Sequence, residues 1–331
     1  MALLQLREHG LYCPAGDFYV DPWEPVERAI LTHAHSDHAV PGSRAYLAAA
    51  SGLAILRQRL GSDADMQAVP YGAHITIGGV TVSLHPAGHI LGSAQIRIES
   101  GGEVWVVSGD YKLAPDPTCP PFEPVRCHTF VTESTFGLPI FRWPPTGDVI
   151  DSIHSWWRAN QESGKVSLLF GWPLGKMQRV LAALDPAIGS IYAHGAVERV
   201  NRVYRECGVA LPAAPPPAGD IKRALILAPP DCQGSPWMKR FGAASTALVS
   251  GWMRIRGTRR RRSLDRGFVL SDHADWPALL TAIDQTRAQS VWVTHGFRAP
   301  LVRWLQEHGR EAVEVPVRAA PDEPAIQECE S

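Results

Sequence analysis

The segment AILTHAHSDHAVPGS places four possible metal ligands within six residues: His33, His35, Asp37 and His38. In an extended chain His33 and His35 face the same side, and a turn after them would carry Asp37 and His38 to a neighbouring position. Neutral imidazole and carboxylate suit Zn²⁺ and also Mn²⁺, and the segment has no thiolate to choose between them. The segment therefore predicts ligands for two adjacent divalent ions, although a polar loop with exposed histidines has the same composition.

Further candidate ligands follow apolar runs: His89 in PAGHILGSA, Asp110 in VVSGDYK and His295 in VWVTHGF. Taken singly, each histidine could be a structural residue, but loops at strand ends can bring such side chains to one edge of a sheet. Two ions about 3.5–4 Å apart can generate hydroxide and stabilise charge on a phosphoryl centre. The expected arrangement has one ion on His33, His35 and His89, the other on Asp37, His38 and His295, and Asp110 bridging them.

The elements that must position these residues alternate between short β-branched runs and helical patterns, which predicts an α/β fold. The runs GVTVSLH, AQIRIES and EVWVVSGD follow one another so closely that part of the sheet must be antiparallel. From about residue 136 the pattern becomes regular strand–helix alternation, as in an inserted domain. We expect a discontinuous first domain over 1–135 and 265–318, an inserted domain over 136–264, and a flexible tail over 319–331.

Composition excludes several classes of protein. The 331 residues are 45% hydrophobic and carry a net charge of -1, so the chain is neither a disordered polyelectrolyte nor globally basic. Its six cysteines include no C-x-x-C pair, which argues against a zinc ribbon or a disulfide framework. No apolar run approaches the roughly 18 residues of a membrane span, and the first residues do not resemble a secretory signal. We expect a cytoplasmic protein with no membrane association.

Any affinity for nucleic acid must therefore come from a local patch. The densest positive run is Arg259, Arg260, Arg261 and Arg262, which either contacts backbone phosphates or forms a solvated loop. In GWPLGKMQRV the spacing is not that of a Walker loop, but Lys176 at a helix start either lies near a phosphate or belongs to a surface loop.

Several tryptophans lie in the strand–helix segments. They could stack on bases, but large aromatic residues in such segments usually pack in the core, and core packing is our expectation here. The residues concerned are Trp143, Trp156, Trp157, Trp172 and Trp252.

The H-x-H-x-D-H loop, the His89 loop, the Asp110 strand end and the late His295 together resemble the metallo-β-lactamase fold. The resemblance makes Asp21 in YVDPW a supporting aspartate. TESTFG with Glu133, SDHADW with His273 and THGF resemble the signatures of the β-CASP nucleases, which cleave nucleic-acid phosphodiesters. The implied architecture is an αββα sandwich with an inserted β-CASP α/β domain.

The run from FRWPPTG through HSWWRANQESGKVSLLFGWPLGKMQRVLAAL is similar to the bacterial DNA-ligase-associated exonucleases. This resemblance implies a DNA exonuclease that uses a two-metal-activated hydroxide. The implied setting is DNA repair beside an ATP-dependent DNA ligase, a helicase and a phosphoesterase. It also implies catalytic roles for Asp37 and for His273, a general acid oriented by Glu133. An N-cap or core residue, or an eighth ligand, is the alternative reading of His273.

Three other functions remain open. An RNA-processing nuclease of the same family would use the same residues. A thioester or lactam hydrolase would need neither Glu133, His273 nor an inserted domain long enough to cover a polymer. A non-catalytic binding subunit would be expected to lack ligands, whereas every ligand position is filled here.

Overall fold

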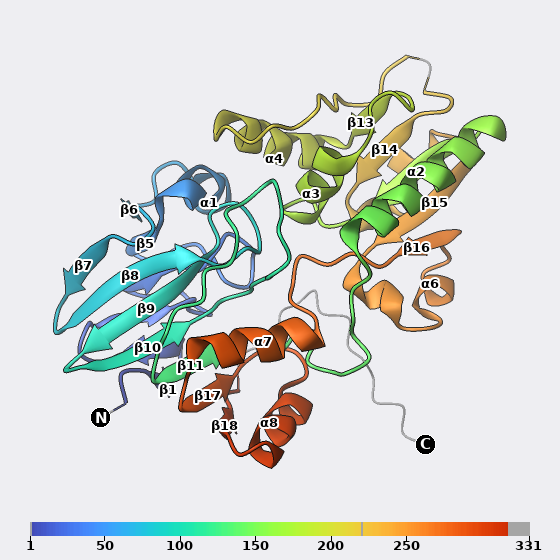
Figure 1. Cartoon of the computed structure of the whole chain (residues 1–331). Helices are drawn as coiled ribbons and strands as arrows, with labels where there is room; N and C mark the ends of the chain where they lie inside the picture. The colour runs from blue at the N-terminus through green and yellow to red at the C-terminus, as the bar shows by residue number, and fades with distance from the viewer. Residues whose placement is uncertain (1, 220, 317–331) are drawn as a thin grey trace.

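The computed structural model describes residues 2–219 and 221–316, so the tail expected over 319–331 lies outside the described residues. The chain forms three β-sheets with helices around them (Figure 1). The first sheet has six strands in sequence order, antiparallel from β1 to β3 and parallel from β3 to β6. Its strands are β1 (Gln5–Arg7), β2 (Gly10–Cys13), β3 (Phe18–Val20), β4 (Arg28–Ile30), β5 (Ala45–Ala49) and β6 (Met66–Val69).

The second sheet has seven strands in the order β18-β17-β11-β10-β9-β8-β7. Strands β7 to β10 pair antiparallel, which confirms the prediction from their close spacing, and β10, β11, β17 and β18 pair parallel. The strands are β7 (His74–Ile77), β8 (Val80–Pro86), β9 (Ala94–Ser100), β10 (Glu103–Val107), β11 (Thr129–Thr132), β17 (Ser290–Val293) and β18 (Glu311–Glu314).

The first two sheets share one apolar core, in which Ile30 and Leu47 from one sheet cluster with Val82 and Ile96 from the other. Helices α7 (Trp276–Thr286) and α8 (Arg298–Glu307) cover the outer face of the second sheet, and α1 (Leu53–Leu60) lies beside the first (Figure 1). Helix α7 begins at a strong start signal, because the Asp275 carboxylate accepts a hydrogen bond from the amide of Ala278. This arrangement confirms the expected αββα sandwich.

The third sheet is wholly parallel, in the order β13-β14-β12-β15-β16. Its strands are β12 (Val166–Phe170), β13 (Ile191–Ala193), β14 (Leu225–Ala228), β15 (Ala244–Val249) and β16 (Arg266–Phe268). The accompanying helices are α2 (Thr146–Glu162), α3 (Lys176–Ala183), α4 (Gly195–Glu206), α5 (Pro236–Lys239) and α6 (Thr258–Arg261), with 3-10 turns at Pro230–Cys232 and Gly251–Arg254. A further 3-10 turn, Ala50–Gly52, lies between β5 and α1. The inserted α/β unit is thus confirmed as an element of the fold.

The exact division of the chain stays a proposal, with one refinement. Strand β16 pairs with β15, so the parallel sheet extends beyond residue 264 and a boundary that leaves it intact falls after Phe268. Apolar contact continues between the units: Ile55 and Leu91 belong to the same buried cluster as Leu181 and Tyr204. The Tyr204 hydroxyl also accepts a hydrogen bond from the amide of Leu91 at 3.2 Å. Shared burial therefore fixes the inserted unit against the sandwich.

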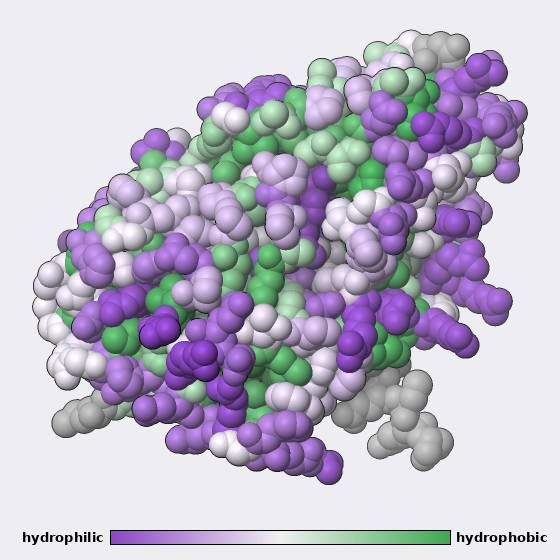
Figure 2. Space-filling view, in the orientation of Figure 1, coloured by the Kyte–Doolittle hydropathy of each residue, from purple (hydrophilic) through white to green (hydrophobic). Residues whose placement is uncertain are grey.

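The surface carries no extended region of one character on the face shown in Figure 2, where hydrophilic and hydrophobic residues are interspersed. Within residues 2–219 and 221–316, none of the helices combines the length and the apolar composition that crossing a bilayer requires.

Candidate metal centre

The histidine-rich segment follows β4 and turns sharply, with the amides of His38 and Ala39 both donating to the carbonyl of His35. This turn, the loop after β8 and the end of β10 bring one group of predicted ligands together. The nearest ring nitrogens of His33 and His35 are 3.1 Å apart, as are those of His89 and His35. The Asp110 Oδ2 atom lies 3.4 Å from His33 Nε2 and 3.7 Å from His89 Nε2.

The outer nitrogens of these rings show where the protons lie. His35 Nε2 faces the carbonyl of Leu174 at 3.3 Å and His89 Nδ1 faces the carbonyl of Asp272 at 2.9 Å. Because a carbonyl can only accept, each outer nitrogen carries the hydrogen and the inner nitrogen of a neutral ring presents a lone pair. His35 Nδ1 and His89 Nε2 thus direct lone pairs at each other from 3.1 Å. A shared cation relieves that repulsion.

The same logic applies to His33 and His38, and both lead to Asp21. The Thr32 hydroxyl donates to Asp21 Oδ2 at 2.5 Å and so accepts from His33 Nδ1 at 3.0 Å. His38 Nδ1 donates to Asp21 Oδ2 at 2.7 Å. Asp21 thus contacts the outer nitrogen of His38 directly and that of His33 through the Thr32 hydroxyl. Such outer contacts are typical of histidines that bind metal ions.

The inner nitrogen of His38 is a buried polar atom with no hydrogen-bond partner among the described residues. It lies 3.5 Å from Asp37 Oδ2 and 3.6 Å from Asp110 Oδ2. His295 stacks on the same ring with centroids 5.2 Å apart. The side chains expected around the second ion are therefore neighbours, and Asp110 lies between them and the first group.

The first group has the dimensions of a tetrahedral site. Four ligands at about 2.0–2.1 Å from Zn²⁺ lie about 3.3 Å from one another. Four of the six separations among His33, His35, His89 and Asp110 run from 3.1 to 3.7 Å, and all of their ligand atoms lie within 4.8 Å of one another. The residues present thus fit a divalent ion, and this donor set suits Zn²⁺ and Mn²⁺ alike.

The pKa shifts indicate that the histidines of the first group are neutral and that Asp37 and His38 of the second group are charged. Burial lowers the pKa of His33, His35 and His89, which keeps their inner nitrogens free for a cation. Burial opposes the ionised form of Asp37, but the nearby histidines, His38 first, hold its pKa at about 2. For His38 burial works against protonation, and the surrounding aspartates outweigh it and raise its pKa.

His295 is placed by a strained turn. Its φ is +49°, and Gly296 follows with φ +59°. A Cβ on Gly296 would lie 2.3 Å from the carbonyl oxygen of Ser134, so no other residue fits there. The Ser134 hydroxyl in turn donates to the carbonyl of His295. The turn after β17 thus ties His295 to the segment that carries Glu133.

Glu133 and His273 form a contact next to the metal ligands. His273 Nδ1 lies 3.1 and 3.0 Å from the two carboxylate oxygens of Glu133, which also accepts from the amide of Tyr111 at 2.8 Å. Burial disfavours the imidazolium, but Glu133 and then Asp110 raise the pKa of His273 to about 9. Asp110, Glu133 and His273 are also close enough to hold an ion together, so the ligand reading of His273 stays open beside the acid reading.

Of the residues predicted to bind phosphate, Lys176 and Arg262 line one cleft, whereas Arg259, Arg260 and Arg261 are not among its lining residues. Lys176 is buried and its ammonium lies 2.7 Å from Asp272 Oδ1, so its charge is already matched within the protein. The carbonyl of Ser271 accepts from both Lys112, at 2.7 Å, and Arg179, at 2.9 Å. Sequence reasoning missed this buried network around residues 271 and 272. In the sequence, the one feature that could have indicated this network is that residues 271 and 272 come directly before His273.

A cleft of about 320 Å³ opens beside the metal ligands. Asp37, Asp110, His273 and His295 line it from the sandwich side. The turn Gly171–Trp172–Pro173 and the segment Leu248–Trp252 line it from the carboxyl ends of β12 and β15. Ligands in α/β proteins usually bind at that edge of a parallel sheet.

Two arginines reach the cleft, and only one of them belongs to the predicted run. They are Arg262 and Arg59 from α1, whereas Arg260 and its neighbours are not among the lining residues. Arg259 instead donates to the carbonyl of Asp265 at 2.6 Å, and Arg261 to the Thr258 hydroxyl at 3.4 Å.

The tryptophans also differ in their surroundings: some are buried, and one is exposed at the cleft. Trp156 and Trp157 are buried, as expected of core residues. The expectation is wrong for Trp172, whose residue surface is 39% exposed at the cleft, because it follows β12 in a turn and not in a buried strand or helix.

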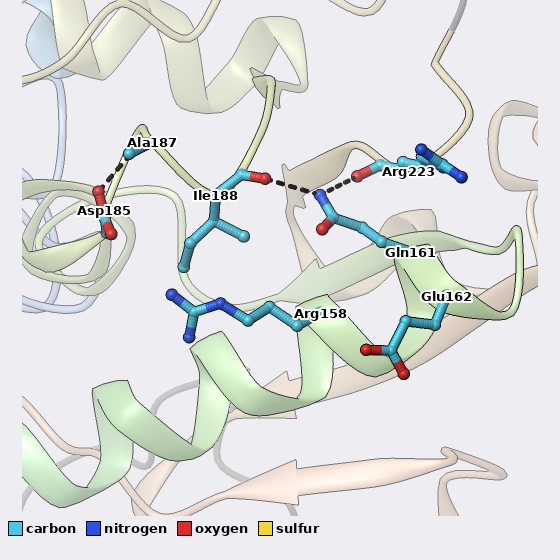
Figure 3. A pocket seen from close by; sticks show the side chains of 7 residues that line it. All are labelled: Arg158, Gln161, Glu162, Asp185, Ala187, Ile188 and Arg223. Atoms are coloured by element: carbon cyan, nitrogen blue, oxygen red, sulfur yellow. Dashed lines mark hydrogen bonds between the residues drawn. The ribbon is translucent and has the colours of Figure 1, made fainter.

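A second pocket, of about 460 Å³, lies on the inserted unit (Figure 3). Gln161 crosses it by donating to the carbonyls of Ile188 and Arg223, each at 3.0 Å. Its charged side chains are two arginines and two carboxylates at exposed positions: Arg158, Arg223, Glu162 and Asp185. With its charges balanced and none of the predicted ligands nearby, it offers no comparable chemistry.

Comparisons with known proteins place the chain among larger relatives. It is 31% identical over 324 residues to a protein named probable DNA ligase from Opitutus terrae, covering 95% of this chain and 32% of that protein. It is 32% identical over 123 residues to RNase aCSPSF2 from Saccharolobus solfataricus, covering 36% of this chain and 25% of the relative. It is 31% identical over 126 residues to endoribonuclease YSH1 from Yarrowia lipolytica, covering 36% of this chain and 14% of the relative. The chain therefore spans about a third or less of the length of these relatives.

The fold has a counterpart among solved structures. A protein of unknown function from Enterococcus faecalis V583 superposes with a TM-score of 0.58 at 13% identity, over 88% of this chain and 79% of that one. At that identity the likeness concerns the fold alone. A scan against protein-family models matched none.

Proposed function

The chain belongs to the β-CASP family of the metallo-β-lactamase fold, and from that membership we propose that it is a metal-dependent nuclease that hydrolyses DNA phosphodiester bonds. One observation carries the proposal: buried imidazole lone pairs and carboxylates converge on a cleft that also holds the Glu133–His273 pair. That combination provides charge stabilisation and a proton donor on one side of a bound polymer.

In this proposal His33, His35 and His89 would hold one divalent ion, Asp37, His38 and His295 would hold the other, and Asp110, which lies near both groups, would be a ligand shared by them. Zn²⁺ or Mn²⁺ bound there would lower the pKa of water, supplying a hydroxide nucleophile near neutral pH, and stabilise charge on the phosphoryl group. The protein's own contribution is to keep each ring in one tautomer, through Asp21, Thr32 and the carbonyls of Leu174 and Asp272.

His273 has the role of general acid in the proposal. Glu133 accepts the hydrogen of Nδ1, which orients the ring and leaves Nε2 to donate a proton to the departing oxygen. His273 lines the cleft, while Glu133 is 1% exposed and acts only through it. Glu133 is therefore a positioning residue in this scheme.

DNA is the proposed polymer because the alignment that spans 95% of the chain is to a protein named as a probable DNA ligase. We propose exonucleolytic action in cytoplasmic DNA repair, in company with an ATP-dependent DNA ligase, a helicase and a phosphoesterase. RNA is the second candidate substrate, because two proteins named as ribonucleases match about a third of the chain.

The test compares end-labelled DNA and RNA. Purified protein is stripped with a chelator, reloaded with Zn²⁺ or Mn²⁺, and incubated with 5′- and 3′-labelled strands of each polymer. Release of mononucleotides from DNA is expected. Release from RNA alone would favour the RNA-processing alternative. Hydrolysis of neither polymer with either metal would reject a nuclease, and turnover of a thioester or lactam would then identify a small-molecule hydrolase.

A further inference from the structure

Trp172 differs from every other tryptophan of the chain. All eleven tryptophans lie within the described residues, and Trp172 is the one whose side chain is exposed. Exposed indole is costly, since a tryptophan buries more apolar surface than almost any other residue when it is covered. Trp172 lies in the cleft that the candidate metal ligands line, so its exposed indole is available to pack on a ligand bound there.

The backbone beneath the ring is firmly held. Trp172 follows Gly171 at the carboxyl end of β12, and its carbonyl accepts from the amide of Met177 at 3.2 Å. A Cβ on Gly171 would lie 2.1 Å from the Met177 side chain, so the turn packs closely on α3. Trp172 thus projects from a rigid turn, which limits the entropy that a ligand must remove when it packs on the ring.

The cleft around the ring matches a nucleotide chain in charge and size. Arg59 and Arg262 line it together with Trp172, and guanidinium groups are suited to backbone phosphates. Its volume of about 320 Å³ lies near the lower end of the roughly 300–1,000 Å³ typical of small-ligand sites. A single nucleotide unit fits a space of this size.

Building on the proposed function, we propose that Trp172 is a base-stacking residue that positions an unpaired nucleobase next to the scissile phosphate. The substrate of this site is then a single-stranded nucleic-acid end. Stacking on an aromatic ring tolerates every base, because each base has a π-face, so the residue selects unpaired structure and not sequence.

The experiment is a double-mutant cycle that combines loss of the Trp172 ring with loss of one base from the oligonucleotide. Chelator-treated protein binds fluorescently labelled single-stranded DNA, followed by anisotropy, and the oligonucleotide carries an abasic residue at each of its terminal positions in turn. Trp172→Ala should weaken binding of the intact strand by about 5- to 100-fold, the range expected for loss of one stacked base. One abasic position should weaken the wild-type protein by a similar factor and have no further effect on Trp172→Ala. Trp172→Phe should retain most of the affinity.

Two controls isolate the cleft. Ile140 is 54% exposed and is not among the residues that line the cleft, so Ile140→Ala should bind like the wild type. A blunt duplex should bind the wild type more weakly than the single strand. The proposal would be overturned if the abasic position weakened Trp172→Ala as much as it weakens the wild type, or if Trp172→Ala bound with unchanged affinity. Equal binding of duplex and single strand, or no binding of any strand, would also overturn it. Because binding is measured without metal, a protein that binds in this pattern yet hydrolyses neither polymer would refute the proposed nuclease and leave the stacking role standing.

Discussion

The two walls of the cleft are built differently. The sandwich wall presents acidic and histidine side chains: Asp110 is almost completely buried, and Asp37, His273 and His295 are partly buried. The wall from the inserted unit presents Trp172, Pro173 and Leu174, with its buried cation Lys176 already paired to Asp272. The difference indicates that one wall holds the reaction centre and the other recognises the polymer. Variants of the two walls should therefore fail in different ways.

The largest effect is expected from the sandwich wall. Asp37→Ala or His38→Ala should abolish nuclease activity, because each removes a ligand of the proposed second ion and leaves its neighbours with unmatched charge. Circular dichroism should be nearly unchanged, and metal analysis should show a loss of bound ion. Near-wild-type turnover of either variant at saturating metal would refute the two-ion arrangement.

Next in size is the loss of the proposed acid. His273→Ala should keep its metal content and lose about 10²–10⁴ in turnover of an ordinary phosphodiester. A diester with a p-nitrophenolate leaving group, which needs no protonation, should recover part of that loss. If the variant loses metal, or slows equally on both substrates, His273 is a ligand and not the acid.

Breaking the Lys176–Asp272 ion pair, which joins the two walls, should lower the stability of the protein more than its affinity for DNA. Lys176→Ala leaves the Asp272 carboxylate buried without its partner and should cost about 3–5 kcal/mol in the free energy of unfolding, measured with urea. Lys176→Met combined with Asp272→Asn should recover part of that loss because no lone charge remains. A variant that keeps its stability but loses affinity for DNA would instead support the phosphate contact predicted for Lys176.

The smallest effects should come from single arginines and should separate the cleft from the rest of the basic run. Arg59→Gln and Arg262→Gln should weaken binding of all sequences and reduce the slope of log affinity against log salt by roughly one unit each. Arg260→Gln is the matched control and should leave the slope unchanged, because its side chain is exposed and is not a cleft-lining residue. A full unit lost in Arg260→Gln would extend the interface along α6.

Much of this protein is determined locally. His33, His89 and Asp110 follow closely after the ends of β4, β8 and β10, and residues just beyond a strand must lie near the edge of the sheet. The neighbourhood of His33, His89 and Asp110 can therefore be predicted from short motifs. The antiparallel pairing of β8, β9 and β10 is equally local, because the connections between them are too short for a crossover.

Tertiary structure decided how those residues are held and which groups face them. The carbonyls of Leu174 and Asp272 that fix His35 and His89 lie 139 and 183 residues away from them in the chain. Arg59 enters the cleft and Arg260 does not, although both are arginines in helical segments. Composition cannot distinguish them, because burial, pairing and exposure depend on which distant surfaces the folded chain brings together. The exposed ring of Trp172 is settled in the same way, by the position of its turn opposite the metal ligands.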